Sequence, residues 1–229
     1  MELAANLRQV RERIAEAARR AGRDPAGIRL VAVSKTVEAD VIRALVAAGH
    51  TLCGESRPQV LRDKARLLAD TPVRWHFIGP LQSNKIKYVY PVAELVHSID
   101  RPDLLDAFAE WARRTGRRCP CLLEVHISDE ATKQGFDPQE VLGVIERIRD
   151  NPDLDVQGLM GMAPFVPEEA PVRAAFRRLA GLFEASRALE GRGYRARELS
   201  MGMTDDFPLA VEEGATIVRI GRAVFGDHP

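Results

Sequence analysis

The chain has 229 residues, 45% of them hydrophobic and 29% charged, and this balance excludes a disordered or fibrous protein. The 33 basic and 33 acidic residues cancel to a formal net charge of +0, so we expect no nucleic-acid partner. Apolar runs stay far below the roughly 18 residues of a membrane span, and the Arg-rich N-terminus lacks the apolar segment of a signal peptide. We therefore expect a cytoplasmic protein with no membrane contact.

Helical and strand patterns alternate along the chain. Apolar residues at spacings of three and four predict an amphipathic helix from the N-terminus to about Gly22. The uniformly apolar run Ile28–Ser34 then predicts a parallel strand that is covered on both faces. Seven further strands are predicted at residues 51–54, 75–78, 94–99, 121–127, 156–160, 198–200 and 216–220. Helices are predicted around residues 41–46, 60–68, 82–88, 102–111, 138–149, 172–189 and 205–213, with the one at 172–189 the longest.

Eight strands, spaced by roughly 25 residues and separated by helices, favour closure into a (β/α)8 barrel, also called a TIM barrel. An open, doubly wound sheet is the alternative, but no Gly-x-Gly-x-x-Gly fingerprint follows the first strand. We therefore predict an α/β fold in which residues 1–229 form a single barrel domain preceded by an extra helix.

The three cysteines of the chain are Cys53, Cys119 and Cys121. An odd number, in a chain large enough to be stabilised by its core, indicates reduced thiols. Cys119 and Cys121 are separated by one residue, and no Cys or His pair at ligand spacing accompanies them. We therefore expect no metal site.

Functional residues of such barrels lie just after the strands, and Lys35 directly follows the first one. It is one of only five lysines, against twenty-eight arginines. A lysine desolvated at the mouth of a barrel can lose its proton and attack a carbonyl carbon, which arginine cannot do. The alternative is a lysine that extends to solvent or pairs with a carboxylate.

The loops after strands seven and eight have the composition of a phosphate site. The first loop contains Ser200, Gly202 and Thr204, and the second contains Gly221 and Arg222. These two loops form the recurrent phosphate site of this fold. The alternative is that Thr204 only caps a helix and Gly221 only forms a turn.

A phosphate held across the barrel mouth from Lys35 indicates a ligand with a phosphate at one end and an aldehyde at the other, which fits pyridoxal 5'-phosphate. If Arg219 points inward, its cation faces the pyridine nitrogen and keeps it unprotonated, which weakens the ring as an electron sink. The alternative is an outward arginine in an ion pair.

Together these motifs resemble the pyridoxal phosphate homeostasis proteins, the YggS/PROSC family. The resemblance covers nearly the whole chain and rests on Ala32–Thr36, Gly54–Glu55, Trp75–Lys85, Gly158–Met160, Ser200–Asp206 and Val218–Gly221. It implies a fold like the N-terminal domain of alanine racemase. It also implies that Lys35 carries the aldimine, that Ser200, Thr204, Gly221 and Arg222 hold the phosphate, and that Arg219 faces the ring nitrogen.

Two positions depart from the family pattern. Ser56 stands where the family usually has Asn, which puts any amide contact from that position in doubt. Arg222 stands where a small residue is common, so that only its backbone N–H carries over directly.

The resemblance further implies a role in vitamin B6 and amino-acid homeostasis without known catalytic turnover. The resembling racemases take a second acid/base, a tyrosine, from a further domain and a partner subunit, whereas Tyr88, Tyr90 and Tyr194 of this chain lie away from the predicted mouth. The absence of that domain also favours a monomer. The alternative is an enzyme, either a residual amino-acid racemase or a Schiff-base aldolase acting on a sugar phosphate. His76, His97 and His126 are interpreted as core or mouth histidines, and Glu124 and Lys133 have no identified partner.

Overall fold

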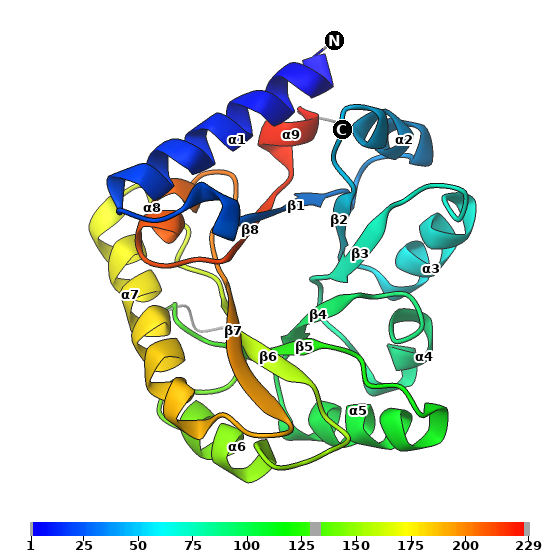
Figure 1. Cartoon of the computed structure of the whole chain (residues 1–229), viewed down its shortest axis with the longest axis vertical. Helices are drawn as coiled ribbons and strands as arrows, with labels where there is room; N and C mark the ends of the chain where they lie inside the picture. Colours follow the sequence, from blue (N-terminus) through cyan, green and yellow to red (C-terminus); the bar gives the residue numbers. More distant parts are fainter. Residues whose placement is uncertain (1, 129–133, 227–229) are drawn as a thin grey trace.

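The computed structural model describes residues 2–128 and 134–226 of the chain. Its eight parallel strands are hydrogen-bonded in chain order and close into a barrel through the pairing of β1 with β8 (Figure 1). This confirms the predicted (β/α)8 architecture. The strands are β1 (Arg29–Val33), β2 (Leu52–Glu55), β3 (Arg74–Phe77), β4 (Leu95–Ile99), β5 (Cys121–Val125), β6 (Val156–Gly161), β7 (Tyr194–Ser200) and β8 (Ile217–Ile220).

Helices surround the ring of strands (Figure 1). The predicted extra helix, α1, precedes the barrel and packs against α8 and α9. It buries the apolar stripe Leu7, Val10 and Ile14, which produced its periodicity in the sequence. The α-helices are α1 (Glu2–Arg20), α2 (Ala39–Ala47), α3 (Pro58–Leu67), α4 (Ile86–Val89), α5 (Pro102–Thr115), α6 (Val141–Ile148), α7 (Glu169–Ser186), α8 (Phe207–Glu212) and α9 (Arg222–Phe225).

Two of the sequence predictions about these elements are wrong, and one element was missed. Strand β7 begins at Tyr194 rather than at residue 198, because buried Tyr194 and Ala196 alternate with the exposed Arg195 and Arg197. That alternation is typical of a strand covered on one face only, which a search for uniformly apolar runs does not detect. Helix α1 has 19 residues and exceeds α7, which has 18. The short α9 was not predicted.

Side chains fill the barrel interior in layers. Six of them form a buried apolar cluster, namely Val31, Leu52, Leu95, Leu122, Met160 and Ile217. Two residues further along β4, β5 and β8, on the same face of each strand, come His97, Glu124 and Arg219, all buried. The interior therefore changes from apolar to polar toward the carboxyl ends of the strands, and we call this end of the barrel the C-terminal rim.

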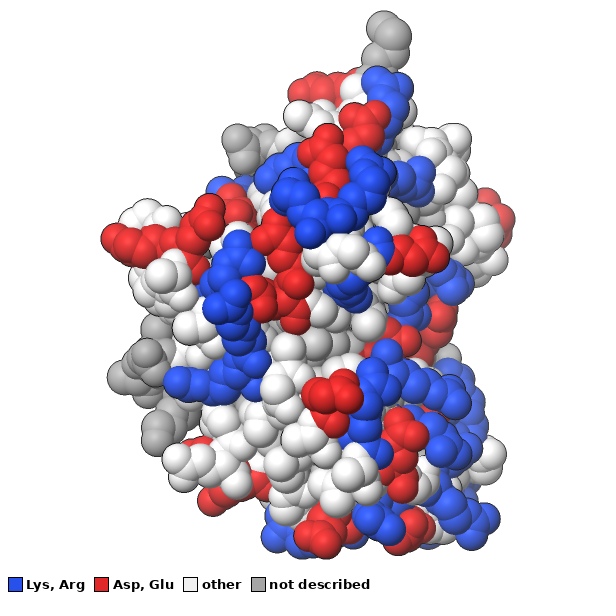
Figure 2. Space-filling model, turned by 60° about the vertical axis from the view of Figure 1, so that its left-hand side comes forward, with Lys and Arg blue, Asp and Glu red and all other residues white. Residues whose placement is uncertain are grey.

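The outer surface carries charges of both signs. Figure 2 shows basic and acidic groups interleaved on the side where α7 and α8 lie. Arg173 pairs there with Glu212 and Glu213, and Arg20 also pairs with Glu212. None of the helices in residues 2–128 and 134–226 has the length and apolar character needed to cross a membrane.

Candidate functional site

Lys35 is exposed in the turn that directly follows β1, at the C-terminal rim. The turn is tied to β2, because the backbone N–H and the hydroxyl of Ser34 both donate to the carbonyl oxygen of Gly54, at 2.9 and 3.2 Å. The carbonyl oxygen of Lys35 accepts a bond from Arg57 Nη2 at 3.4 Å. The main chain at Lys35 is therefore anchored while its side chain reaches solvent.

A buried ion pair supports this turn. Lys64 Nζ donates to Glu55 Oε1 at 2.5 Å and to the carbonyl oxygen of Ser34 at 2.7 Å. Glu55 is fully buried, and its Oε2 accepts a bond from the N–H of Ser56 at 3.1 Å. Sequence reasoning missed Lys64, although its spacing from the buried Leu61 and Leu68 places it on the core-facing side of α3.

The loops after β7 and β8 contact each other. Arg222 Nη2 donates to Asp205 Oδ2 at 2.5 Å, so the Arg222 side chain lies against the β7 loop. Gly202 has a φ of +93°, and its carbonyl oxygen accepts from the N–H of Arg219 at 2.9 Å. Within the described part of the chain, the backbone N–H groups of Thr204, Gly221 and Arg222 donate no hydrogen bond. These N–H groups suit an anion.

Lys35 and the two loops lie at the same rim. Strand β1 pairs with β8 in a register that sets Ala32 opposite Ile220. A Cβ atom on Gly221 would lie 3.3 Å from the carbonyl oxygen of Val33, only two residues before Lys35. The closure of the barrel thus brings together segments that are almost the whole chain apart in sequence.

Arg219 points into the barrel and is 5% exposed, which excludes the outward alternative. Its Nη1 donates to Ser200 Oγ at 2.5 Å, and its Nη2 donates to the carbonyl oxygen of Gly161 at 3.1 Å. Burial lowers the pKa of Arg219 to about 10, against the opposing effects of Glu124 and Asp206. The guanidinium stays positively charged at neutral pH.

A chain of hydrogen bonds continues from Ser200 across the interior. Ser200 Oγ is bonded to His97 Nδ1 at 2.9 Å, and His97 Nε2 is bonded to His76 Nδ1 at 2.9 Å. Burial lowers the pKa of His76 to about 3 and that of His97 well below its usual value, so both rings are neutral. The interpretation as core histidines holds for this pair.

Two buried polar atoms are left without a hydrogen bond in the described part of the chain, Nε2 of His76 and Oε2 of Glu124. Burial, with a smaller effect of Asp100, raises the pKa of Glu124 to about 7.

Lys133 lies outside the described residues. Cys53, Cys119 and Cys121 are free and buried, and the described residues contain no group of three or more His, Cys, Asp or Glu side chains that would suit a metal ion.

Comparison with known proteins gives one consistent result. Residues 5–229 match the family model described as alanine racemase, N-terminal domain. A protein of Aquifex aeolicus named pyridoxal phosphate homeostasis protein is 39% identical over 100% of this chain and 99% of its own length. A Deinococcus radiodurans protein of the same name is 42% identical, over 98% of this chain and 100% of that protein. The structure of PipY from Synechococcus elongatus with PLP bound superposes with a TM-score of 0.84 at 30% identity, covering 98% of this chain and 100% of PipY.

Proposed function

The chain belongs to the family of pyridoxal phosphate homeostasis proteins, and we propose that it binds pyridoxal 5'-phosphate and serves the homeostasis of this cofactor and of amino acids without catalytic turnover. The observation that carries the proposal is the meeting of Lys35 with the loops after β7 and β8 at one rim. PipY, which has the same fold at 30% identity, has been solved with PLP bound.

The groups at the rim fit this cofactor. When bound, pyridoxal phosphate supplies an aldehyde that reacts with a primary amine, together with a phosphate dianion. Lys35 offers an exposed amine, and the free N–H groups of Thr204, Gly221 and Arg222 offer donors to the phosphate. Gly202 and Ser200 complete the proposed phosphate loop, although the Ser200 hydroxyl also bonds Arg219 and His97.

Arg219 is suited to face the pyridine nitrogen. Its guanidinium is held from two sides, by Ser200 and by the carbonyl oxygen of Gly161. A cation fixed in this place opposes protonation of the ring nitrogen and so weakens the ring as an electron sink. This supports binding rather than chemistry at the substrate Cα atom.

The tyrosines support a non-catalytic role. Tyr90 Oη donates to the carbonyl oxygen of Arg117 at 2.6 Å, and Tyr194 Oη is bonded to Ser186 Oγ at 2.6 Å. Burial raises the pKa of each to about 12. Tyr88 lies on α4, where its ring contacts the cationic groups of Arg62 and Lys87. None of these three hydroxyls is placed to serve as an acid or base opposite Lys35.

The decisive experiment combines absorption spectroscopy with mass spectrometry. Protein incubated with pyridoxal phosphate is expected to turn yellow, to lose the visible band on borohydride reduction, and to carry the label at Lys35. Lys35→Ala should remain colourless, and no common amino acid should be racemised. A label at Lys64 or Lys85 instead would contradict the proposal.

Two other outcomes would favour an enzyme. Racemisation of an amino acid would support a residual racemase, and a colourless protein that binds a sugar phosphate would support the aldolase. The monomeric state and the cytoplasmic location remain predictions, and light scattering of the purified protein tests the first.

A further inference from the structure

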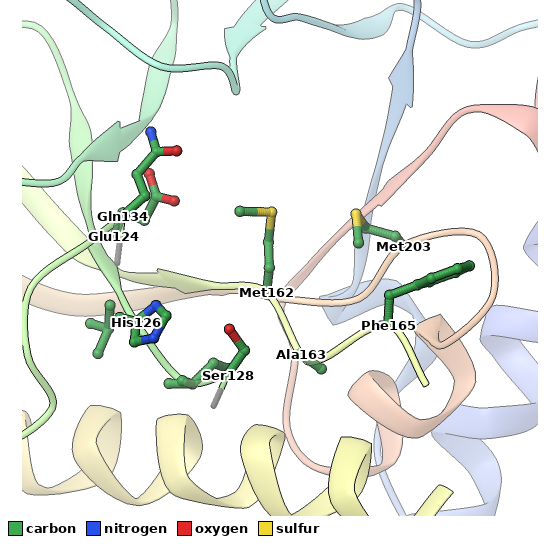
Figure 3. Close-up of a pocket in the computed structure, with 10 residues that line it drawn as sticks. Glu124, His126, Ser128, Gln134, Met162, Ala163, Phe165 and Met203 are labelled. Carbon is green, nitrogen blue, oxygen red and sulfur yellow. The ribbon is translucent and has the colours of Figure 1, made fainter. Parts of the chain in front are cut away.

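A second concave site lies at the rim, over the carboxyl ends of β5 and β6. The cavity has a volume of 470 Å³, within the roughly 300–1,000 Å³ usual for small-molecule sites. In the closed strand order, β5 stands four strands from β1, so the cavity lies across the barrel from the strand that carries Lys35. Figure 3 shows Glu124 beside Gln134 on one side of the cavity and Met203 beside Phe165 on the other, with Met162 between them.

The polar end of the cavity is Glu124. Its side chain projects toward the cavity next to that of Gln134 (Figure 3), and the residue is only 2% exposed. Oε2 has no hydrogen-bond partner in residues 2–128 and 134–226. A buried carboxylate oxygen without a hydrogen-bond donor lowers the stability of the folded protein, and a ligand N–H that donates to it would remove this loss.

His126, Ser128 and Gln134 add polar groups to the cavity, while its side toward Met162 and Phe165 is apolar. Met162 is 43% exposed and Phe165 is 81% exposed, although both are large hydrophobic side chains. The thioethers of Met162 and Met203 are flexible and adapt to a bound chain. The lining therefore combines a polar side, which contains the buried carboxyl group of Glu124, with a short apolar wall.

We propose that this cavity binds a small primary ammonium compound, with its nitrogen hydrogen-bonded to Glu124 and a short apolar chain against Met162 and Phe165. The ammonium group supplies both the missing donor and the compensating charge. The cavity lies on the β5 and β6 side of the rim and shares Met203 with the loop after β7. Titration of the protein with and without the cofactor therefore decides whether the amine site is separate from the cofactor site.

Calorimetric titration at pH 8, where Glu124 is ionised, tests the proposal with three matched probes. They are n-butylamine, L-norvaline, which adds a carboxylate to the same amine, and pentanoate, which lacks the nitrogen. We expect n-butylamine or L-norvaline to bind and pentanoate not to bind. Tighter binding of L-norvaline would identify amino acids as the natural class, and tighter binding of n-butylamine would identify simple amines.

Variants assign the binding to the cavity. Glu124→Gln should weaken binding at least about tenfold, while Glu38→Gln, which alters an exposed carboxylate after β1, should not change it. Met162→Ser, which leaves Glu124 in place, should weaken it several-fold and serves if Glu124→Gln does not fold. Equal binding of pentanoate, or unchanged affinity in a folded Glu124→Gln and in Met162→Ser, would overturn the proposal.

The titration is made on cofactor-free protein and on protein whose Lys35 has been modified by pyridoxal phosphate and borohydride. Amine binding to both forms supports a separate site. Binding to the free form alone would mean that the cavity belongs to the cofactor site, which would overturn the inference. If no modification of Lys35 can be made, the proposed function fails, while the cofactor-free protein still tests the cavity.

Discussion

Arg219 and Ser200 are joined by a bond of 2.5 Å from Nη1 to Oγ, which connects β8 to the last residue of β7 inside the barrel. Ser200 is in turn bonded to His97, and Arg219 to the carbonyl oxygen of Gly161. Because His97 is also bonded to His76 of β3, five strands share one buried polar network directly below the C-terminal rim. Ser200 ends β7 and Arg219 is next to the end of β8, so the network lies at the base of the two loops.

Replacing Arg219 should destabilise the barrel. Arg219→Met removes both bonds and leaves Ser200 and the Gly161 carbonyl group without their buried donor, which should lower the free energy of unfolding by about 2–4 kcal/mol. Urea unfolding measures the change. Arg222→Met is the matched control, because its ion pair with Asp205 is exposed and should contribute less than about 1 kcal/mol. Equal losses in the two variants would contradict the role of the buried network.

The ion pair of Lys64 with Glu55 should show strong coupling. Lys64→Met leaves the fully buried Glu55 carboxylate without its cation, and we expect a loss of about 3–5 kcal/mol. The double variant Glu55→Gln, Lys64→Met should lose less than the two single variants together, with a coupling of about 1–3 kcal/mol. Additive losses in denaturant unfolding would show that the two groups do not act as a pair.

Stability should depend on pH through Glu124. Its pKa is raised by burial from the usual 4.5 to about 7 in the folded protein, so the folded state holds more protons than the unfolded state between these values. Stability from this group is therefore lost as the pH rises from about 4.5 to 7 and stays constant above. Relative to Glu124→Gln, the free energy of unfolding of the wild type should fall by up to about 3 kcal/mol across this pH range. A pH-independent difference between the two proteins would contradict the assignment.

Three buried histidines should give the stability of the folded protein a pH dependence of the opposite sign. Burial lowers the pKa of His50 to about 4 and that of His76 to about 3, and it lowers that of His97 well below 6.5. The unfolded chain takes up protons at these groups first, so their stability contribution is complete above pH 6.5 and is lost as the pH falls toward 4. Three histidines outweigh one Glu124, and thermal unfolding should therefore occur at lower temperature at pH 5 than at pH 6.5. His50→Gln should reduce this difference.

Two glycines provide a test of backbone packing. Gly158 has a φ of +141°, and a Cβ atom there would lie 2.0 Å from the carbonyl oxygen of Glu198 in β7. Gly158→Ala should therefore cost roughly 3 kcal/mol or more, because strand backbone has to move. Gly143 lies within α6 with nothing within 4 Å of a Cβ atom, and Gly143→Ala should stabilise by about 0.5–1 kcal/mol. Thermal midpoints of the two variants should move in opposite directions.

Much of the barrel could be predicted from the sequence because its signals are local. A parallel strand that is covered on both faces is a short apolar run, and Arg29–Val33 and Cys121–Val125 both have this character. The place of Lys35 after the first strand, and of Ser200 and Gly221 in the last two loops, followed from the order of these runs. The strand at Tyr194–Ser200 was underestimated because exposed arginines interrupt its apolar pattern.

Only the tertiary structure decided three features of the site. They are the inward direction of Arg219, the support of the Lys35 turn by Lys64, and the contact of Arg222 with Asp205. Ser200 and His97 are 103 residues apart in sequence, and Arg219 and Gly161 are 58 residues apart. No local sequence pattern therefore predicts their hydrogen bonds. The alternation along a strand determines which side chains share a face, but not whether that face points into the barrel. Which partners a side chain meets depends on the register in which the barrel closes, since closure removes the polar groups from water and leaves only one another to bond.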